Sequence, residues 1–532
     1  VRHFAKRGGY SHPARLGPNS EISVRAAACV LRIRPWGLRG VAARTLDIRL
    51  AIDPARARLW HRALADALRR RGHRVAIALR PGGPRPPAAI GLILALEGLT
   101  GARRSGASGC PWDDVQPCGG DAPPDLEIDL TGGAWDAAPL RRLAPVYAGA
   151  LIEEAAVAEL TSGGRPLIGV RDSLAAPTPS MMHPGLDAPH RIGRSLDNLG
   201  ARLAVLLARA ADAVAAGGVT AGAAPLDLTP TAAWRGGLAL APLRYALNRV
   251  LRALARGAPH WHVGWRRASA GRIQDTLALP AGGWSVLPDD GARFYADPFV
   301  FAQDGRTWLF VEDLPYATGR ALISAVEIGP DGPVGAPTPV LERDVHLSYP
   351  FVFARDGQIW MIPESAGSAT VDLYRAEAFP HRWVHHATLL SGIEVGDATI
   401  VEEAGRLWMF GSVGGSESSS WDALHIWSSD RLEGPWQPHG RNPVVLDALG
   451  ARPAGAFFRR DGALWRPAQD CAAGYGAGLA LCRVMQLDDD GFAQKIETVL
   501  AAGGPGWPGT GLHTLNWAAG IEVIDGCRTR NR

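Results

Sequence analysis

Cysteine is scarce and irregularly placed in this sequence, which argues against two kinds of stabilised domain. The chain has 532 residues and six cysteines, and no two of these form a CxxC pair. Structural zinc sites and disulfide frameworks both need cysteines at regular spacings. We therefore expect free thiols, and with them a reducing compartment and a cytoplasmic location.

Long apolar runs are missing as well. No stretch of 18 or more apolar residues occurs, and the best candidate, Ala88 to Leu96, is followed directly by Glu97. A helix needs about 20 apolar residues to cross a bilayer, so we expect no transmembrane segment. The N-terminus lacks the apolar core and small-residue cleavage site of a secretory signal.

The sequence has no large excess of either charge: 56 Lys and Arg stand against 52 Asp and Glu, for a formal net charge of +4. Much of the excess falls in the first 45 residues, where nine basic residues face one acid, Glu21. Without a basic field elsewhere we expect no nucleic-acid partner. We expect residues 1–45 to be a basic, disordered leader.

From Leu46 the sequence alternates short apolar strands with amphipathic helices. The expected strands cover 46–53, 73–80, 125–132 and 166–173, and the expected helices cover 57–72, 147–163 and 195–216. This alternation is typical of a parallel sheet with helices on both faces. It predicts a Rossmann-like α/β domain over 46–217, then a linker with a short helix over 218–260. No GxGxxG follows the first strand, so we expect no dinucleotide cofactor.

After Trp261 the pattern changes to a repeat of two strands joined by a turn that ends in glycine. Each second strand carries a tryptophan three residues after that glycine, and the four tryptophans are Trp308, Trp360, Trp408 and Trp465. Their spacings of 52, 48 and 57 residues suit four strands per unit. A weaker fifth unit covers 513–526, and strands from before Asp297 would close the ring. The repeat predicts an all-β five-bladed β-propeller over 261–532.

The register of the repeat also predicts which side chains meet at one mouth of the propeller. The residue that opens each first strand lies 11 before the tryptophan: Asp297, Tyr349, Asp397 and Ala454. The residues four and five after the tryptophan close the second strand at the same end of the blade. We therefore expect an acidic mouth made of Asp297, Glu312, Asp313, Glu364, Asp397 and Asp470, with His346, Arg452, Arg466 and His513 as its neighbours.

Crowded carboxylates of this kind titrate abnormally, because burial and like charges raise some of their pKa values. One raised acid beside one ionised base is what cleavage of a glycosidic bond requires. Each residue also has a structural interpretation, as a turn cap, a solvated loop residue or an arginine partner. No cluster of metal ligands stands out and we expect no cofactor, although two or three carboxylates would suffice to hold Ca²⁺ at the propeller axis.

Several segments resemble a known family, among them "FYADPFVF", "HLSYPFVFARDGQIWMIPES", "HGRNPV" and "ARPAGAFFRRDGALWRPAQDCAAGYG". They are similar to the N-terminal domain of plant glucosamine inositolphosphorylceramide transferases, a domain that also occurs in bacterial proteins. The resemblance covers about 261–527 and implies a five-bladed propeller related to glycoside hydrolase family forty-three. The region before it resembles, loosely, a formyltransferase-like domain, but lacks the Asn-x-His and Asp set of those enzymes.

The resemblance implies catalytic roles for two acids, with Asp297 as the base and Asp397 as the acid that modulates pKa values. The third acid of the hydrolase family is a blade-four glutamate, and here the corresponding positions hold Ala454 and Gln469–Asp470. Glu364 or Asp470 is then the candidate proton donor.

Three functions stay open, and in each the partner is a carbohydrate or glycoconjugate. The first is an enzyme that cleaves or transfers a glycosyl group at the mouth. The second is a non-catalytic glycan-binding module. The third is a two-domain sugar-modifying transferase whose donor binds the Rossmann-like half. The sequence carries no signal of oligomeric state.

Overall fold

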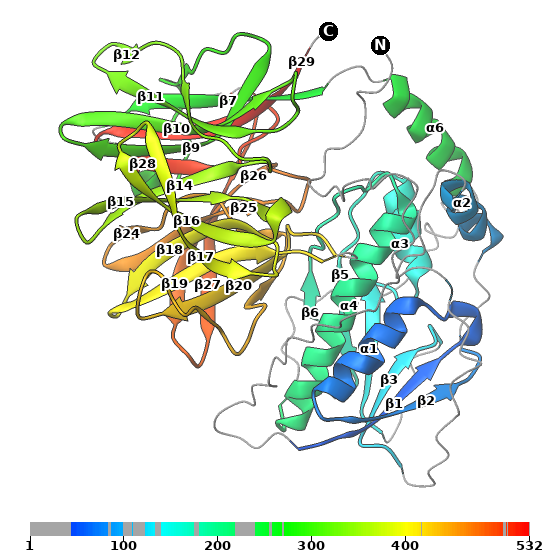
Figure 1. Ribbon diagram of the computed structural model, residues 1–532. Coiled ribbons are helices and arrows are strands. Elements are labelled where there is room, and N and C mark those ends of the chain that lie inside the picture. The colour runs from blue at the N-terminus through cyan, green and yellow to red at the C-terminus, as the bar shows by residue number, and fades with distance from the viewer. Residues whose placement is uncertain are drawn as a thin grey trace, which may run out of the picture.

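The computed structural model has an α/β part followed by a larger β part (Figure 1). It describes residues 44–82, 87–98, 109, 123–133, 140–174, 180–218, 240–254, 258–268, 271–415, 418–503, 507 and 509–530. The expected leader, apart from its last two residues, and most of the expected linker lie outside these residues. Within the linker the predicted short helix is present as α6 (Ala241–Leu254).

A six-stranded mixed sheet forms the α/β part. Its strands are β1 (Asp47–Ile52), β2 (Arg74–Leu79), β3 (Leu126–Leu130), β4 (Arg142–Tyr147), β5 (Ile168–Asp172) and β6 (Ser180–Met182). They lie in the order β2-β1-β3-β4-β5-β6. The first four are parallel, so the carboxyl ends of β1, β3 and β4 meet at one edge.

One strand runs against the expectation of a parallel sheet, because β5 pairs antiparallel with both β4 and β6, and β6 therefore has the direction of the first four strands. The connection from β4 to β5 contains helix α3 (Glu153–Thr161), which has nine residues. A backbone hydrogen bond of 2.8 Å from Ala148 N to Leu167 O holds the start of β5 beside the end of β4. The chain is therefore not carried back to the opposite edge, as a parallel crossover requires.

Helices α1 (Leu59–Arg70) and α4 (Ile192–Ala215) pack against each other over the sheet. The contact is close because Gly200 of α4 has no side chain, and a Cβ atom there would lie 2.6 Å from the Trp60 ring. Leu64 and Leu68 of α1 join the same apolar core. The apolar segment 88–96 belongs to α2 (Ala88–Gly98). Among the described residues, no helix combines the length and apolar character needed to cross a bilayer.

Five sheets make up the β part and confirm the predicted propeller. Blade one has β9 (Arg293–Gln303), β10 (Arg306–Pro315), β11 (Leu322–Gly329), β12 (Gly332–Pro333) and β13 (Thr338–Leu341). Blade two has β14 (Ser348–Arg355), β15 (Gln358–Glu364), β16 (Thr370–Ala378) and β17 (Arg382–Ser391). Blade three has β18 (Val395–Glu403), β19 (Arg406–Val413), β20 (Ala423–Ser429), β21 (Gln437–Pro438) and β22 (Val445–Leu446).

Blade four has β23 (Leu449–Pro453), β24 (Phe458–Arg460), β25 (Ala463–Asp470), β26 (Gly478–Leu487) and β27 (Phe492–Ala501). Blade five has β28 (Leu515–Ala518), β29 (Ile521–Arg530), β7 (Ala258–Arg267) and β8 (Ser285–Val286), and a short helix, α7 (Ile273–Thr276), lies between β7 and β8. The last strand, β29, pairs along its whole length with β7, the first strand of the propeller. The ring is thus closed by strands from both ends of the propeller sequence, as predicted.

Polar side chains fill the centre of the ring. The Tyr349 hydroxyl group accepts a hydrogen bond of 2.6 Å from Gly455 N in blade four and lies 2.9 Å from Thr399 Oγ1 in blade three. Asn516 of blade five donates to Pro298 O in blade one. These hydrogen bonds join blade two to blades three and four, and blade five to blade one.

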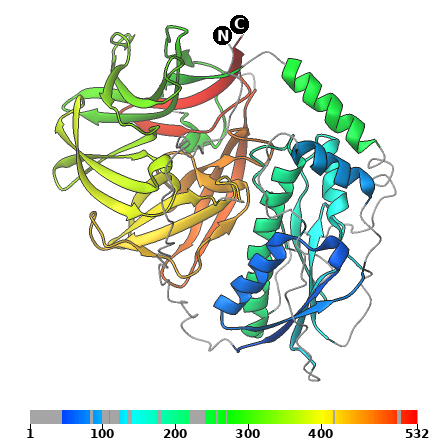
Figure 2. The same cartoon turned by 45° about the vertical axis from the view of Figure 1, so that its right-hand side comes forward.

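The two parts of the chain also contact each other directly, and both views place them side by side (Figures 1 and 2). Arg202 of α4 forms a buried ion pair of 2.6 Å with Asp422 of the propeller. Gly185 N donates to the same carboxylate at 2.7 Å. His183 and Asp447 form a second pair at 3.1 Å.

Candidate active site at the propeller mouth

The residues that open the inner strands share one unusual backbone feature. Asp297, Tyr349 and Asp397 have positive φ angles of 48°, 45° and 56°. In all three blades the ladder between the first two strands shifts register at this point. A β-bulge of this kind turns the residue out of the ladder and re-aims its side chain. The residue that lies 11 before the tryptophan therefore has the same backbone geometry in blades one, two and three.

A carboxylate of the preceding blade accepts a hydrogen bond from the backbone N–H of each of these residues. Asp525 of blade five accepts from Asp297 N at 3.1 Å, and Asp297 in turn accepts from Tyr349 N at 3.2 Å. Glu364 of blade two accepts from Asp397 N at 2.9 Å. These acids thus join neighbouring blades, because a buried N–H without a partner is costly.

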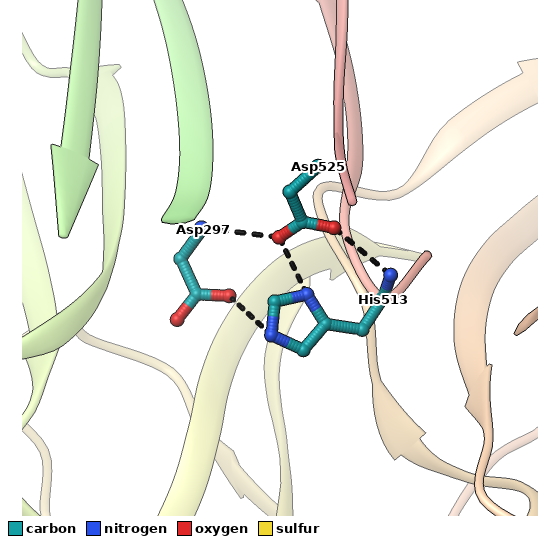
Figure 3. Close-up of side chains that lie close together, drawn as sticks. All are labelled: Asp297, His513 and Asp525. Carbon is teal, nitrogen blue, oxygen red and sulfur yellow. Dashed lines mark hydrogen bonds and ion pairs between the residues drawn. The ribbon is translucent and has the colours of Figure 1, made fainter. Parts of the chain in front are cut away.

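His513 occupies the fifth opening position. It lies two residues before Leu515, which pairs with Ile524, and Asp297 stands at the same offset from Phe299, which pairs with Phe310. Figure 3 shows the imidazole between two carboxylates. Its Nδ1 atom lies 2.5 Å from Asp525 Oδ2, and its Nε2 atom lies 3.7 Å from Asp297 Oδ1.

Burial raises the pKa of Asp297 to about 7, although the His513 charge opposes this and Glu312 and Asp525 add to it. Burial lowers the pKa of His513, but the carboxylates of Asp525 and Asp297 outweigh it and raise the pKa above its usual value. Both groups of the Asp297–His513 pair therefore have raised pKa values, that of Asp297 about 7. Such a pair suits general acid–base chemistry, for which a pKa near the working pH is favourable.

A second cluster surrounds Asp397, which is 1% exposed. Arg452 Nε lies 2.6 Å from Asp397 Oδ2, and Arg452 also lies 3.2 Å from Glu364. Gln469 donates to Asp397 Oδ2 at 2.9 Å. Burial raises the pKa of Asp397 well above its usual value, against the effect of the Arg452 charge. Asp297 is one of the charges that raise it further, so the two clusters belong to one electrostatic site.

An aromatic wall borders this site. The Tyr475 ring lies 5.2 Å from the His513 ring and 5.6 Å from the guanidinium group of Arg452. Trp421 lies 5.5 Å from Tyr475, and Trp261 stacks on His513 at 4.1 Å. Trp421 and Tyr475 are only partly buried. Half-exposed rings beside hydrogen-bonding groups suit the apolar face of a sugar ring.

The adjacent acids Glu312 and Asp313 diverge, as neighbours on a strand do. Glu312 lies 3.0 Å from His346 Nε2 and contributes to the raised pKa of Asp297. Asp313 is fully buried and bonds to Arg293 and Ser324 instead. The structure therefore brings Glu312 and His346 to the mouth, and it engages Asp313 in contacts within blade one.

Two further predicted residues make contacts of a structural kind. Arg466 is 1% exposed and donates to the backbone carbonyl groups of Gly450 and Ala451 in its own blade. Asp470 accepts a hydrogen bond from Ala472 N at 2.9 Å, as a turn-capping aspartate does. The structure thus brings together Asp297, Glu312, His346, Glu364, Asp397, Arg452 and His513.

Sequence reasoning missed Asp525 and the aromatic wall. The fifth unit lacks the glycine-to-tryptophan offset, so no register assigned a role to Asp525. Tyr475 and Trp421 lie in connections between strands, where the repeat has no fixed positions. The signal that was available for Asp525 is its place in "IEVIDG", an apolar strand interrupted by one acid.

Asp297, His513 and Asp525 are also close enough to share a metal ion, and among the described residues they form a group with that geometry. The hydrogen bonds argue for another role. Asp525 already accepts from the backbone N–H groups of Asp297, His513 and Thr514. Its remaining contact is with His513 Nδ1, and a carboxylate in that position orients an imidazole. Ca²⁺ binding at the propeller axis therefore stays a prediction, and the hydrogen bonds that Asp525 already accepts do not favour it.

Comparison with known proteins identifies relatives of the propeller. Residues 287–518 match a family model described as glucosamine inositolphosphorylceramide transferase 1, N-terminal. Glucosamine inositolphosphorylceramide transferase 1 of Arabidopsis thaliana is 33% identical over 250 residues, which cover 44% of this chain and 32% of the plant protein. The protein of that name from Oryza sativa subsp. japonica is 31% identical over 260 residues, covering 46% and 35%. The predicted resemblance of the propeller is therefore confirmed, and the chain spans about a third of the length of these relatives.

Solved structures with a similar arrangement include two glycoside hydrolases. One is Zg3597, a family 117 glycoside hydrolase from Zobellia galactanivorans, with 12% identity and a TM-score of 0.33 over 51% of this chain and 90% of the other. The other is GH43B of the Bacteroides ovatus xyloglucan locus, with 15% identity and a TM-score of 0.31 over 44% and 51%. The propeller is defined here by its five sheets and their closure. The formyltransferase-like resemblance of the α/β part stays a prediction.

Proposed function

We propose that the protein is a carbohydrate-active enzyme that binds a glycosyl group at the propeller mouth and cleaves or transfers it. The observation that carries this proposal is the Asp297–His513 pair, in which a buried carboxyl with a pKa of about 7 lies 3.7 Å from an imidazole. Asp525 holds the other ring nitrogen, so the Nε2 atom is the one directed at Asp297.

In this mechanism Asp297 and His513 share one proton. The ionised Asp297, held beside the protonated His513, takes a proton from the attacking hydroxyl group or water. Glu364, the candidate proton donor, gives its proton to the oxygen of the leaving group as the glycosidic bond breaks. The Asp397–Arg452–Glu364 cluster orients the sugar and supplies negative charge near a transition state with oxocarbenium character. Glu364, whose side chain is 11% exposed, is the member that a ligand reaches most easily.

The relatives support a substrate class. Their name describes proteins that act with glucosamine and inositolphosphorylceramide. Amino sugars and their conjugates are therefore the first ligands to test, with the aromatic wall of Trp421 and Tyr475 as the stacking surface.

The decisive experiment compares Asp297→Asn with Asp313→Asn, a buried aspartate of the same blade that does not face the mouth. Each protein is incubated with a panel of glucosamine- and N-acetylglucosamine-containing glycans, and products are measured by mass spectrometry. We expect turnover by the wild type and the Asp313 variant, and a loss of at least a hundredfold for Asp297→Asn. Turnover that survives Asp297→Asn would refute the mechanism.

A glycan-binding module without catalysis is the second candidate. It is favoured by one observation: Asp397 is fully engaged by Arg452 and Gln469, and the closing position of blade four holds this neutral amide. Saturable binding of a glycan by the wild type without any product, with affinity retained in Asp297→Asn, would establish this second function.

A further inference from the structure

Two neighbouring helices at the outer edge of the α/β part leave apolar side chains in water. They are α2 and α6, which contact each other and lie side by side in both views (Figures 1 and 2). Among the residues that the structure describes, twelve large apolar side chains are exposed, and five of them are leucines of α2, of α6 or of the residue before α6. We call these five the leucine face: Leu92, Leu96, Leu240, Leu243 and Leu247.

The exposed side of α2 carries no polar side chain. Its exposed residues recur at the three- and four-residue spacing of one helix face, and they are Ala88, Gly91, Leu92, Ala95 and Leu96. The one charged residue of this helix, Glu97, is 7% exposed, and its carboxylate accepts hydrogen bonds of 2.7 and 2.8 Å from the first N–H groups of α4. A surface helix ordinarily turns polar or charged residues to water, so the outer side of α2 suits contact with an apolar phase.

Helix α6 combines an apolar outer side with positive charge. Ala241 and Tyr245 pack in the core of the α/β part, whereas Leu243 and Leu247, on the opposite side, are 67% and 52% exposed. The sequence of this helix contains three arginines and no acidic residue, and the first of these, Arg244, lies at the flank between the two sides. A basic helix with an exposed leucine stripe is typical of helices that lie in a membrane interface.

The charge of this surface decides between an association of two copies and a lipid partner. Twofold symmetry would place the same helices of two copies against each other, and with them charges of one sign. An anionic lipid surface suits both features, because leucines enter the boundary between headgroups and acyl chains while positive charge is attracted to the phosphate groups. With 11 and 14 residues, α2 and α6 suit an arrangement along the surface, since about 20 residues are needed to cross a bilayer.

We propose that α2 and α6 form a docking surface for an anionic membrane, in which the leucine face inserts shallowly and the positive charge of α6 selects for acidic lipids. Such binding is peripheral and reversible, because its strength comes from a small apolar area together with charge attraction. The leucine face shares no residue with the propeller mouth, so this proposal is independent of the function proposed there.

The test is co-sedimentation of the full-length chain with lipid vesicles. One set of vesicles consists of phosphatidylcholine, and the other contains about 30% phosphatidylserine, which is anionic. We expect saturable binding to the anionic vesicles and roughly tenfold weaker binding to the neutral ones. Added salt should weaken the binding to anionic vesicles, because it screens the charges on both surfaces.

Two double variants test the leucine face itself. One combines Leu243→Gln with Leu247→Gln, and the other combines Leu92→Gln with Leu96→Gln. We expect each to weaken binding to anionic vesicles by about tenfold or more, since two leucines no longer leave water on binding. All four side chains are exposed, so the fold should persist, and circular dichroism verifies this. Leu174→Gln is the matched control at a leucine that is 66% exposed elsewhere in the α/β part, and it should bind like the wild type.

Four outcomes would overturn the proposal. One is the absence of binding to the anionic vesicles. Another is binding that both double variants retain in full, which would assign it to other basic parts of the chain. A third is equally tight binding to neutral vesicles, because the charge of α6 predicts a preference. The last is self-association in place of vesicle binding, measured by sedimentation velocity and abolished by the double variant of α6, which would identify a second copy as the partner.

Discussion

Asp297 is a buried carboxyl whose ionisation costs folding energy. Its pKa is raised from 3.8 to about 7, so it contributes stability below about pH 4 that is lost as the pH rises through 7. The raised pKa of His513 acts in the same direction. Stability of the wild type should therefore decline between pH 4 and pH 8.

Asp297→Asn removes the contribution of this carboxyl to the pH dependence of stability, and it also removes the proposed catalytic base. Asn can still accept from Tyr349 N and bond to Thr514, the partners of the native side chain. We expect the melting temperature of the variant to exceed that of the wild type by roughly 5 °C at pH 8, and by little or nothing at pH 4. Thermal unfolding at both pH values measures this, and an equal difference at the two would contradict the assigned pKa.

Gln469 shows why a single substitution does not restore a third acid to blade four. Its amide donates to Asp397 Oδ2 at 2.9 Å and to Pro453 O at 3.1 Å, and the side chain is 1% exposed. An ionised glutamate would donate to neither acceptor and would add a like charge beside Asp397. We expect Gln469→Glu to lower the free energy of unfolding by about 3 kcal/mol at pH 8 and by less at pH 5. Urea unfolding measures the loss, with exposed Gln486→Glu as the control.

At the scale of elements, one loop of blade three connects helix α4 to the mouth. Ser419 O and the Asp422 carboxylate both bond to Arg202. Between them, Ser420 accepts a hydrogen bond from Arg452, and Trp421 contacts Tyr475. Four consecutive residues thus transmit the position of α4 to the groups around Asp397.

Arg202→Met should loosen this loop and leave the Asp422 charge buried. Because an unpaired buried charge is costly, we expect a loss of about 3–5 kcal/mol. Adding Asp422→Asn should recover much of that stability without restoring the order of the loop. Hydrogen exchange over 418–422 in the two variants tests this, and protection equal to that of the wild type in the double variant would show that Arg202 does not position the mouth.

The repeat made the strands of the propeller predictable, and the prediction failed where the repeat is irregular. A constant offset between Gly305 and Trp308, repeated in three more blades, gave the register and with it Asp297 and Asp397. The same offset could not place Asp525, because the closing blade is assembled from two distant segments. Arg466, expected as a neighbour of the mouth, bonds instead within its own blade, because strand alternation says which residues share a face but not which partners a long side chain contacts. In the α/β part, four of the strands followed from hydrophobicity, namely β1, β2, β3 and β5. The sequence pattern missed β4 and β6, and it began the helix at Tyr147, which is the last residue of β4, whereas α3 begins at Glu153.

At the scale of the whole molecule, closure of the propeller ring depends on the pairing of β7 with β29. Trp507, which is 1% exposed, covers both strands where each has a glycine. A Cβ atom at Gly264 of β7 or Gly526 of β29 would lie 2.4 Å from its ring. The closure therefore tolerates no side chain at either position.

Gly264→Val should push the Trp507 ring off these two strands and leave their pairing exposed to water. We expect a destabilisation of about 2–3 kcal/mol and faster amide exchange in β7 and β29 than in blades two and three. Gly282→Val is the matched control, because a Cβ atom there meets nothing within 4 Å. A uniform change in exchange over all blades would contradict a local opening of the ring.

The pairing of β7 with β29 also affects how the chain folds during synthesis. During synthesis β7 leaves the ribosome about 250 residues before its partner, a delay of roughly 10–50 s at ordinary elongation rates. Through that interval the edge that pairs with β29 is unpaired while blades one to four are still being synthesised. The nascent chain must therefore be protected from pairing with a neighbouring polypeptide, and slow translation of blades two to four would lengthen its exposure.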